Sequence, residues 1–346
     1  MKENFKNILV VRTDRVGDVI LTTPSLSGLR KAYPKAKITV LVSPLTRELI
    51  EGNPFIDEVL IDDRFKEHKS FVGFWQLVGM LRRKRFDLAI VFHTKKRANA
   101  LCFLAGIPRR IGYRNNKFGF LLTDQVKDER RWGLKHEAEY CLDILKHMGI
   151  NEKDLNFYIP VNRQAEDWFK ELQRAHHITD KEKFFLIHAG ASDPCRLWPA
   201  KQYSQLIEQL NRQYHYKVIL IGDEGARAIS DEIKQLTSIP LIDLVGKTSL
   251  SQLASLIRRT FILISNDSGP VHMGSALGCA VVAIFIRTLP GVNPVRWRPL
   301  GPRARVVEPS EEGQILSSVS GHNPPGMEVV KVSQVLEAVD GIFKLC

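Results

Sequence analysis

Short apolar runs alternate with amphipathic stretches along this chain, and no other feature constrains its fold as strongly. In the first 125 residues, strand-like runs at 8–11, 38–42, 59–61 and 88–92 are each followed by a helix-like stretch, at 21–32, 45–50, 74–81 and 99–105. Alternation of strands and helices is typical of a parallel sheet covered by helices. The first part of the chain is therefore predicted to form an α/β domain.

A second series repeats this pattern without repeating the sequence. Its strand-like runs lie at 184–188, 218–221, 261–264 and 281–285, and its helix-like stretches at 203–210, 226–236, 250–257 and 271–277. A chain of 346 residues is also long for one domain. We therefore predict two Rossmann-like, doubly wound domains that face each other across a cleft.

The boundary between the two series is predicted near Pro160, which interrupts the chain after the amphipathic stretch 135–148. The resulting domains are 1–160 and 161–329. Residues 330–346 follow as a closing segment with a helical pattern.

Composition and charge narrow the function. No apolar run approaches the roughly 20 residues of a membrane span, the polar start lacks a signal-peptide core, and the five cysteines show no C-x-x-C spacing. These features predict a cytoplasmic protein. The net charge of +12 favours an anionic partner, such as a phosphorylated glycolipid or a membrane surface. Nucleic acid is disfavoured, because no zinc-finger spacing or RNP-like aromatic motif is present.

The segment 261–273 runs from a buried strand into a helix that is suited to hold an anion. Asn266, Asp267 and Ser268 can cap the helix, and Gly269 lets the backbone approach a ligand closely. A helix start carries about half a positive elementary charge, so a diphosphate is a natural ligand there. The alternative is an ordinary capped turn without a ligand.

Another strand-to-helix turn lies near the N-terminus, where the apolar run that ends at Arg12 leads into a helix. Asp18 follows this strand. Ligands of open α/β sheets bind outside the carboxyl ends of the strands, so Asp18 is a candidate general base. Arg12 and Arg15 are close enough in sequence to keep it ionised. The alternative is a first-turn acid that only complements the helix dipole.

Together with two further motifs, these segments resemble glycosyltransferase family 9, whose best-known members are the ADP-heptose:lipopolysaccharide heptosyltransferases. The similarity covers nearly the whole chain and rests on 12–19 with Thr23-Pro24, on 106–113, on 188–192 with Trp198-Pro199, and on 266–272. The resemblance implies a GT-B fold and a C-terminal helix that packs back across the first domain. It also implies an inverting transfer of heptose from ADP-heptose to the inner core of lipopolysaccharide, with Asp18 as base.

The resemblance assigns the donor nucleotide-sugar to Gly190, Ser192, Arg196, Glu224, Asp267, Ser268, Gly269 and His272. Arg196 stands where the family usually carries a basic residue near the leaving diphosphate, although it could be a surface arginine. Glu224 is assigned to the nucleoside, with Asp223 as the alternative, and either could instead cap the following helix.

Basic residues of the first domain are assigned to an anionic glycolipid acceptor. They are Lys95, Lys96, Arg97, Arg110 and Arg114. Their charges suit carboxylates and phosphates, although clustered charge also occurs on faces that only contact solvent. An acceptor of this kind would bring the enzyme to the inner face of the cytoplasmic membrane as a peripheral protein.

No metal or other cofactor is expected, because the histidines are widely separated and the Asp-x-Asp motif of metal-dependent glycosyltransferases is absent. Arginines and helix dipoles can neutralise a diphosphate instead. An NAD-dependent oxidoreductase is disfavoured, because the first strand is not followed by G-x-G-x-x-G. Two alternatives stay open: a family member with another donor or acceptor, such as one that builds O-antigen or a modified core, and a non-catalytic binding module.

Overall fold

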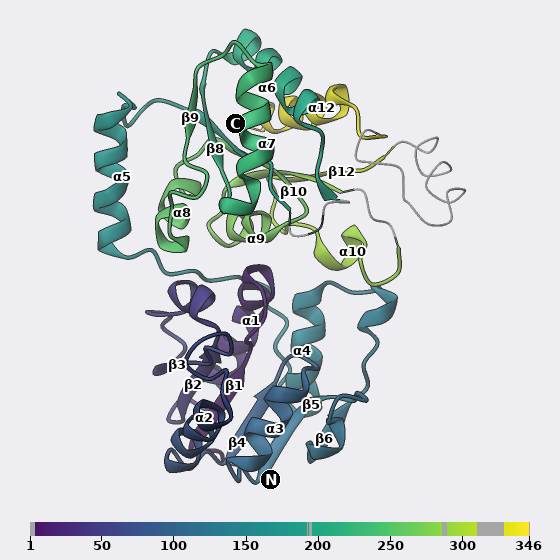
Figure 1. The fold of residues 1–346 in the computed structure, drawn as a ribbon. Coiled ribbons are helices and arrows are strands. Elements are labelled where there is room, and N and C mark those ends of the chain that lie inside the picture. Colours follow the sequence, from purple (N-terminus) through teal and green to yellow (C-terminus); the bar gives the residue numbers. More distant parts are fainter. Residues whose placement is uncertain (1–3, 192, 194–195, 286–288, 310–328, 346) are drawn as a thin grey trace. The chain divides into compact units, whose positions relative to one another are not determined.

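The computed structural model describes residues 4–191, 193, 196–285, 289–309 and 329–345. The chain divides into two compact units, Met1–Pro160 and Val161–Cys346. Each unit contains one six-stranded sheet in which every strand pair is parallel (Figure 1). Helices cover both faces of each sheet, so the doubly wound α/β class predicted from the sequence is confirmed.

The first unit has the strand order β3-β2-β1-β4-β5-β6. Its elements are, in chain order, β1 (Asn7–Val11), α1 (Val16–Ala32), β2 (Lys37–Val42), the 3-10 helix η1 (Pro44–Leu49), β3 (Glu58–Ile61), α2 (Phe71–Arg83), β4 (Leu88–Val91), α3 (Lys96–Leu104), β5 (Arg109–Tyr113), η2 (Gly119–Leu121), β6 (Asp124–Val126), η3 (Arg130–Trp132) and α4 (Glu137–His147).

The second unit has the order β12-β11-β10-β7-β8-β9. Its elements are α5 (Arg163–Ala175), β7 (Phe184–His188), α6 (Ala200–Tyr214), β8 (Lys217–Ile221), η5 (Glu224–Ala226), α7 (Arg227–Leu236), β9 (Leu241–Asp243), α8 (Leu250–Ile257), β10 (Ile262–Asn266), α9 (Gly269–Ala276), β11 (Ala280–Ile284), α10 (Pro294–Trp297), β12 (Ala304–Val307) and α12 (Val332–Phe343).

Strand β1 shows how the first core is built. Ile8 and Val10 point to one face and pack with residues of α1 and α4, whereas Leu9 and Val11 point to the other face and pack with α2 and α3. Because both faces are covered, the strand is apolar at every one of these positions. The continuous apolar run that was visible in the sequence is a consequence of this double burial.

The closing helix α12 belongs to the second unit. Its residues Val335, Val339 and Ile342 are fully buried in the core that α6 forms with the second sheet. The apolar face of the helix is thus used within the second unit, and its packing across the first domain stays a prediction.

Helix α1 continues through Pro24, which lacks the N–H that would bond to the carbonyl of Ile20. The hydroxyl of Thr23 donates a hydrogen bond to this carbonyl at 2.7 Å. Thr23 thus replaces the hydrogen bond that Pro24 cannot make. Without it, the buried carbonyl of Ile20 would have no donor from the helix.

The two sheets share one topology, and this topology defines where ligands bind. In each sheet the first strand is central: the chain proceeds outward on one side and then returns to the other side of that strand. The order thus reverses between β1 and β4 in the first unit and between β7 and β10 in the second. Ligands of open α/β sheets bind at such switch points, outside the carboxyl ends of the strands.

Candidate functional site

The switch point of the first sheet holds Asp18 beside a buried arginine. Asp18 lies in the first turn of α1, and its side chain is 17% exposed. Nη2 of Arg12, the residue that directly follows β1, lies 2.7 Å from Oδ1 of Asp18. This ion pair stabilises the ionised carboxylate and fixes its orientation. Arg15 is the exposed N-cap residue of the same helix.

Arg12 is held by several groups at once. Its Nη1 donates to the carbonyl oxygen of Phe92 at 2.6 Å, its Nη2 also reaches Oε1 of Glu137 at 3.1 Å, and its Nε lies 3.3 Å from Oδ1 of Asp14. Burial alone would lower the pKa of Arg12, but the carboxylates of Asp14, Asp18 and Glu137 raise it well above the usual value. The guanidinium is therefore a fixed positive charge at the centre of the site.

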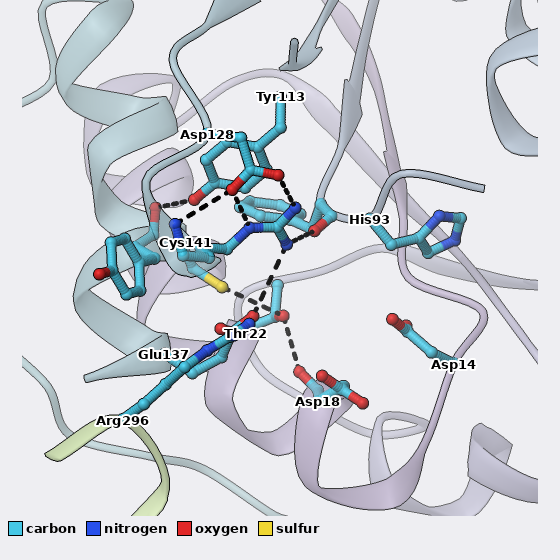
Figure 2. Close-up of polar contacts among 12 residues, drawn as sticks. Asp14, Asp18, Thr22, His93, Tyr113, Asp128, Glu137, Cys141 and Arg296 are labelled. Atoms are coloured by element: carbon cyan, nitrogen blue, oxygen red, sulfur yellow. Dashed lines mark hydrogen bonds and ion pairs between the residues drawn. The ribbon is translucent and has the colours of Figure 1, made fainter. Parts of the chain in front are cut away.

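A second arginine completes this network. Arg130 binds Asp128 through two hydrogen bonds of 2.8 Å and lies over the ring of Tyr113, 3.8 Å from its centroid. Its Nη1 also lies 3.4 Å from the Phe92 carbonyl oxygen, which Arg12 binds as well. Figure 2 shows Asp128 and Glu137 in this set of contacts, with Asp18 nearby and joined to Thr22. Buried charges of both signs thus surround the carboxyl end of β4.

His93 connects the two loops of this switch point. It follows β4, and its Nε2 lies 3.1 Å from the hydroxyl of Thr13, which follows β1. Burial, with the positive charges of Arg12 and Lys95, lowers the pKa of His93 well below the usual value. The imidazole is therefore neutral near pH 7 and serves as a hydrogen-bonding group.

Three of the predicted acceptor residues lie at this carboxyl edge. Lys95 is the N-cap residue of α3, and burial lowers its pKa against the opposing effect of Asp14. Lys96 is exposed, and its Nζ lies 5.6 Å from the ring centroid of Phe118. Arg114 is exposed and directly follows the carboxyl end of β5. All three are positioned where an anionic ligand could reach them.

The other two predicted acceptor residues have contacts of another kind. Arg97 makes two hydrogen bonds to the buried Asp62, at 2.8 and 2.7 Å, and a third to the carbonyl of His68, so it anchors the loop after β3. Arg110 lies at the amino end of β5, at the opposite edge of the sheet from Asp18. It donates to the carbonyl oxygens of Leu121 and Ile107. The expectation that Arg110 lines the same site as Asp18 is corrected by the direction of this strand.

The switch point of the second sheet is held by neutral hydrogen bonds. Nδ1 of His188, at the end of β7, lies 3.2 Å from the hydroxyl of Ser265 in β10 and 3.1 Å from that of Ser268. Burial lowers the pKa of His188 to about 4, although Asp223 opposes the shift. The ring is therefore uncharged near pH 7 and ties two strand ends together.

Asn266 connects the same two loops through its side-chain amide. Its Nδ2 donates to the carbonyl oxygens of Ala189 and Gly190 at 2.9 and 3.3 Å, and its Oδ1 accepts from the hydroxyl of Tyr203 at 2.9 Å. Both side chains are fully buried. Asn266 thus fixes the 189–190 backbone, whereas the sequence indicated only a helix cap.

Gly190 is required by close packing. A Cβ atom there would lie 2.9 Å from Cβ of Ala226 and 3.2 Å from Nε2 of His188. Gly222, after β8, has the same neighbour, because its Cβ would lie 2.7 Å from that of Ala226. The backbone turns after β7 and β8 therefore approach each other too closely for any side chain.

The start of α9 carries the remaining donor candidates. Ser268 is the N-cap residue, but its side chain makes no capping bond to the helix and turns to His188 instead. Gly269 is the first helical residue, and the buried His272 follows in the first turn. Nη1 of Arg196 donates to the backbone carbonyl of Asp267 at 2.9 Å and lies 3.4 Å from its Oδ2. The structure thus brings Arg196 to the same helix start.

Glu224 lies after β8, at the start of η5, and its side chain is 75% exposed. It pairs with Arg227 of the next helix at 3.4 Å. Ser192 lies outside the described residues. Within the described part of the chain, no three His, Cys, Asp or Glu side chains are grouped so that they could hold a metal ion. No helix in that part is long and apolar enough to span a membrane.

The comparison with known families is decisive. The family model of glycosyltransferase family 9 (heptosyltransferase) matches residues 74–319. The chain belongs to glycosyltransferase family 9. It is therefore a glycosyltransferase, as the sequence motifs predicted, and its two sheets are those of the GT-B fold.

Individual members of the family are similar over most of their length. Lipopolysaccharide heptosyltransferase 2 of Escherichia coli K12 is 28% identical over 309 residues, which cover 87% of each chain. A family 9 glycosyltransferase of Veillonella parvula has a TM-score of 0.90 at 26% identity, with 100% of this chain and 99% of that chain covered. The ADP-heptose lps heptosyltransferase II of E. coli shares the fold, with a TM-score of 0.78 at 23% identity and coverage of 98% and 99%.

Several polar groups at the two switch points were not predicted as site residues. In the first unit these are His93, Asp128, Arg130 and Glu137, and in the second Tyr203. Glu137 is 125 residues from Arg12 along the chain. Nothing in the sequence around it indicates that partner, since it reads as one acid in the first turn of a helix.

Proposed function

We propose that this enzyme transfers heptose from ADP-heptose to the inner core of lipopolysaccharide by direct displacement, with Asp18 as the base. The observation that carries the proposal is the Asp18 carboxylate, held 2.7 Å from the buried Arg12 at the switch point of the first sheet. The heptosyltransferases among the relatives support heptose as the sugar. ADP-heptose is named with the E. coli heptosyltransferase II structure.

In the proposed step, an acceptor hydroxyl attacks the anomeric carbon of the heptose. The new carbon–oxygen bond forms as the bond to the β-phosphate breaks, and ADP leaves with the electron pair. Asp18 accepts the hydroxyl proton, and attack opposite the leaving group inverts the configuration. A carboxylate is a weak base, so the step depends on orientation by Arg12 and on late proton transfer.

The donor diphosphate is proposed to bind the start of α9 and the 189–190 turn. Backbone N–H groups at a helix start and a close approach at Gly190 suit a diphosphate. Arg196 would balance the charge of departing ADP, with Asp267, Ser268 and His272 around it. Ser192 and Glu224 complete the proposed donor set, the latter at the nucleoside.

The acceptor is proposed to be an anionic glycolipid that contacts Lys95, Lys96 and Arg114. These three positive charges flank Asp18 along the carboxyl edge of the first sheet, where phosphates or carboxylates of a core sugar would pair with them. Arg97 and Arg110 are not included, because each already binds a carboxylate or backbone carbonyls. We propose that no metal cofactor takes part, because Arg196 and the α9 dipole supply the positive charge that a leaving diphosphate needs.

The proposal is tested by calorimetric titration with ADP-heptose, ADP, UDP and NAD in buffer that contains EDTA. Selective binding of the adenine diphosphates without metal is expected. Transfer to heptose-deficient core oligosaccharide, followed by NMR of the product, should give the anomeric configuration opposite to that of the donor. Selective UDP binding would assign another sugar donor, and a retained configuration would exclude direct displacement.

A further inference from the structure

Exposed aromatic side chains are distributed unevenly between the two units. Among the described residues, every exposed Phe, Trp or Tyr belongs to the first unit, from Phe65 to Tyr158, whereas the large apolar side chains exposed in the second unit are aliphatic. The net positive charge is also concentrated in the first unit. Residues 1–160 contain 29 Lys and Arg against 19 Asp and Glu, a net charge of +10, whereas residues 161–346 contain 21 against 19.

Among the described residues, exposed aromatic and basic side chains are concentrated in residues 64–75, which we call the aromatic–basic segment. Phe65, Phe71 and Val72 are 70%, 78% and 64% exposed, and Trp75 is 44% exposed. The rings of Phe71 and Trp75 are 6.1 Å apart on the first turn of α2. Arg64 lies over the ring of Phe65 at 4.5 Å, and the exposed Lys66 and Lys69 follow.

Hydrogen bonds and close backbone packing fix the conformation of this segment. The hydroxyl of Ser70 caps α2 by accepting from the N–H of Gly73 at 3.0 Å, and a Cβ at Gly73 would overlap the carbonyl of Glu67. Arg97 binds Asp62, just before the segment, and the carbonyl of His68 within it. The exposed rings are therefore presented on an ordered turn rather than on a loose loop.

The aromatic–basic segment lies at the carboxyl edge of the first sheet. It follows the carboxyl end of β3, the same edge of the sheet at which Asp18 lies. Through Arg97 it is tied to the start of α3, where Lys96 lies over the exposed Phe118. Aromatic rings paired with cations thus occur on both sides of Lys95 along this edge.

We propose that the aromatic–basic segment binds the surface of an anionic phospholipid bilayer. Phe65, Phe71 and Trp75 enter the boundary between headgroups and acyl chains, where amphipathic aromatic rings are favoured. Lys66 and Lys69, with Arg64, lie against the lipid phosphates, where each adds attraction to an anionic surface. The charge of the first unit provides the long-range attraction to the same surface.

This inference deepens the proposed function, since a glycolipid acceptor is embedded in such a surface, but the contact itself requires only phospholipid. A protein partner would be expected to leave fewer lysines around the apolar centre of its interface, since charged residues are depleted there. A membrane surface instead favours this combination of exposed rings and lysines.

The test is co-sedimentation of the full chain with vesicles that contain no glycolipid. Vesicles of phosphatidylcholine with phosphatidylglycerol are compared with vesicles of phosphatidylcholine alone, at low and high salt. We expect binding to the anionic vesicles that weakens at high salt. The triple variant Phe65→Ser, Phe71→Ser, Trp75→Ser is expected to lower the partition coefficient by about tenfold or more, and Lys66→Glu with Lys69→Glu by about tenfold.

Matched controls come from the opposite edge of the same sheet. Phe103 is 47% exposed at the end of α3, and Lys35 is exposed just before β2. Phe103→Ser and Lys35→Glu should bind anionic vesicles as the unchanged protein does. Equal losses in the control and segment variants would overturn the proposal, as would equal binding to neutral vesicles.

A second readout separates this proposal from the proposed function. Transfer to a delipidated core oligosaccharide should be unchanged in the triple variant, because none of its residues belongs to the proposed donor or acceptor site. If the unchanged protein transfers heptose to this oligosaccharide but does not sediment with anionic vesicles, the membrane surface is excluded while the proposed function stands. If it sediments but does not transfer, the proposed function fails while the membrane surface stands.

Discussion

The two switch points have the same topology but opposite chemistry. At the first, Arg12 and Glu137 are buried and form an ion pair, and Arg12 forms another with Asp18. At the second, His188 and Asn266 are buried and neutral, and their contacts are hydrogen bonds between uncharged groups. Topology thus determines where a site forms, whereas the residues that follow each strand determine what the site can do.

The difference matches a division of labour between the units. A fixed positive charge that orients a carboxylate suits a proton acceptor, and the neutral second edge leaves a helix start and Arg196 as the main attraction for an anion. Variants at one edge should therefore affect turnover, and variants at the other should affect nucleotide binding.

The largest effect is expected from Asp18→Asn. The amide keeps nearly the same shape but cannot accept the acceptor proton, so kcat should fall by about 10²- to 10⁴-fold. Steady-state kinetics at saturating donor measures this change. Glu51→Gln is the control, because Glu51 is half exposed and pairs with the exposed Arg47 four residues before it. An Asp18→Asn enzyme with a kcat within threefold of the unchanged enzyme would remove Asp18 from the base role.

The next largest effect is a loss of stability when a buried charge is removed at the first switch point. Glu137→Leu removes one carboxylate from the fully buried Arg12 and should lower the free energy of unfolding by about 3–5 kcal/mol, measured by urea denaturation. Glu51→Gln, at an exposed pair, should cost less than about 1 kcal/mol. Equal losses at the two sites would mean that burial does not strengthen the Arg12 network.

The neutral His188 at the second switch point predicts that the free energy of unfolding depends on pH. The folded-state pKa of His188 is about 4, below its ordinary value of 6.5, so below pH 6.5 the unfolded chain binds a proton that the folded chain does not. The free energy of unfolding should therefore fall between pH 6.5 and 4, by roughly 3 kcal/mol from this group. His188→Gln should show a correspondingly shallower decrease, whereas His215→Asn, at an exposed position, should follow the unchanged protein. Parallel curves for all three proteins would contradict the buried neutral ring.

A smaller effect is expected from Gly190→Ala. The added Cβ would lie 2.9 Å from that of Ala226, so the free energy of unfolding should fall by about 1–3 kcal/mol. Adding Ala226→Gly should recover much of this loss, because it removes the opposing atom. Gly79→Ala, where the nearest atom is 3.6 Å away in helix α2, should instead be neutral or stabilising. Failure of the rescue would show that the strain lies elsewhere in the turn.

The central strands could be predicted from the sequence because burial on both faces makes them continuous apolar runs, as in β1 and β10. Four strands were missed: β5, β6, β9 and β12. Strands β6 and β9 have only three residues each and include an aspartate, and β5 and β12 include arginines. Short, partly exposed strands do not have an apolar pattern that distinguishes them from loops.

The same limit applies to the site. The positions of Asp18 and of 267–269 at the carboxyl edges of the sheets could be predicted, because each lies in the turn or first helical turn after its strand. That of Glu137 could not, because its partner Arg12 is brought to it only by the packing of α4 on α1. Arg110 was assigned to the wrong edge because local charge does not indicate where the strand begins.

The division between the two edges is tested most directly by calorimetric titration of ADP into Asp18→Asn and Ser268→Ala. The dissociation constant of ADP should stay within about twofold in Asp18→Asn, since the variant alters only the proposed base. It should rise by about five- to tenfold in Ser268→Ala, as expected for a lost hydrogen-bonding group at the start of α9. A rise of equal size in Asp18→Asn, or an unchanged constant in Ser268→Ala, would contradict this account of the enzyme.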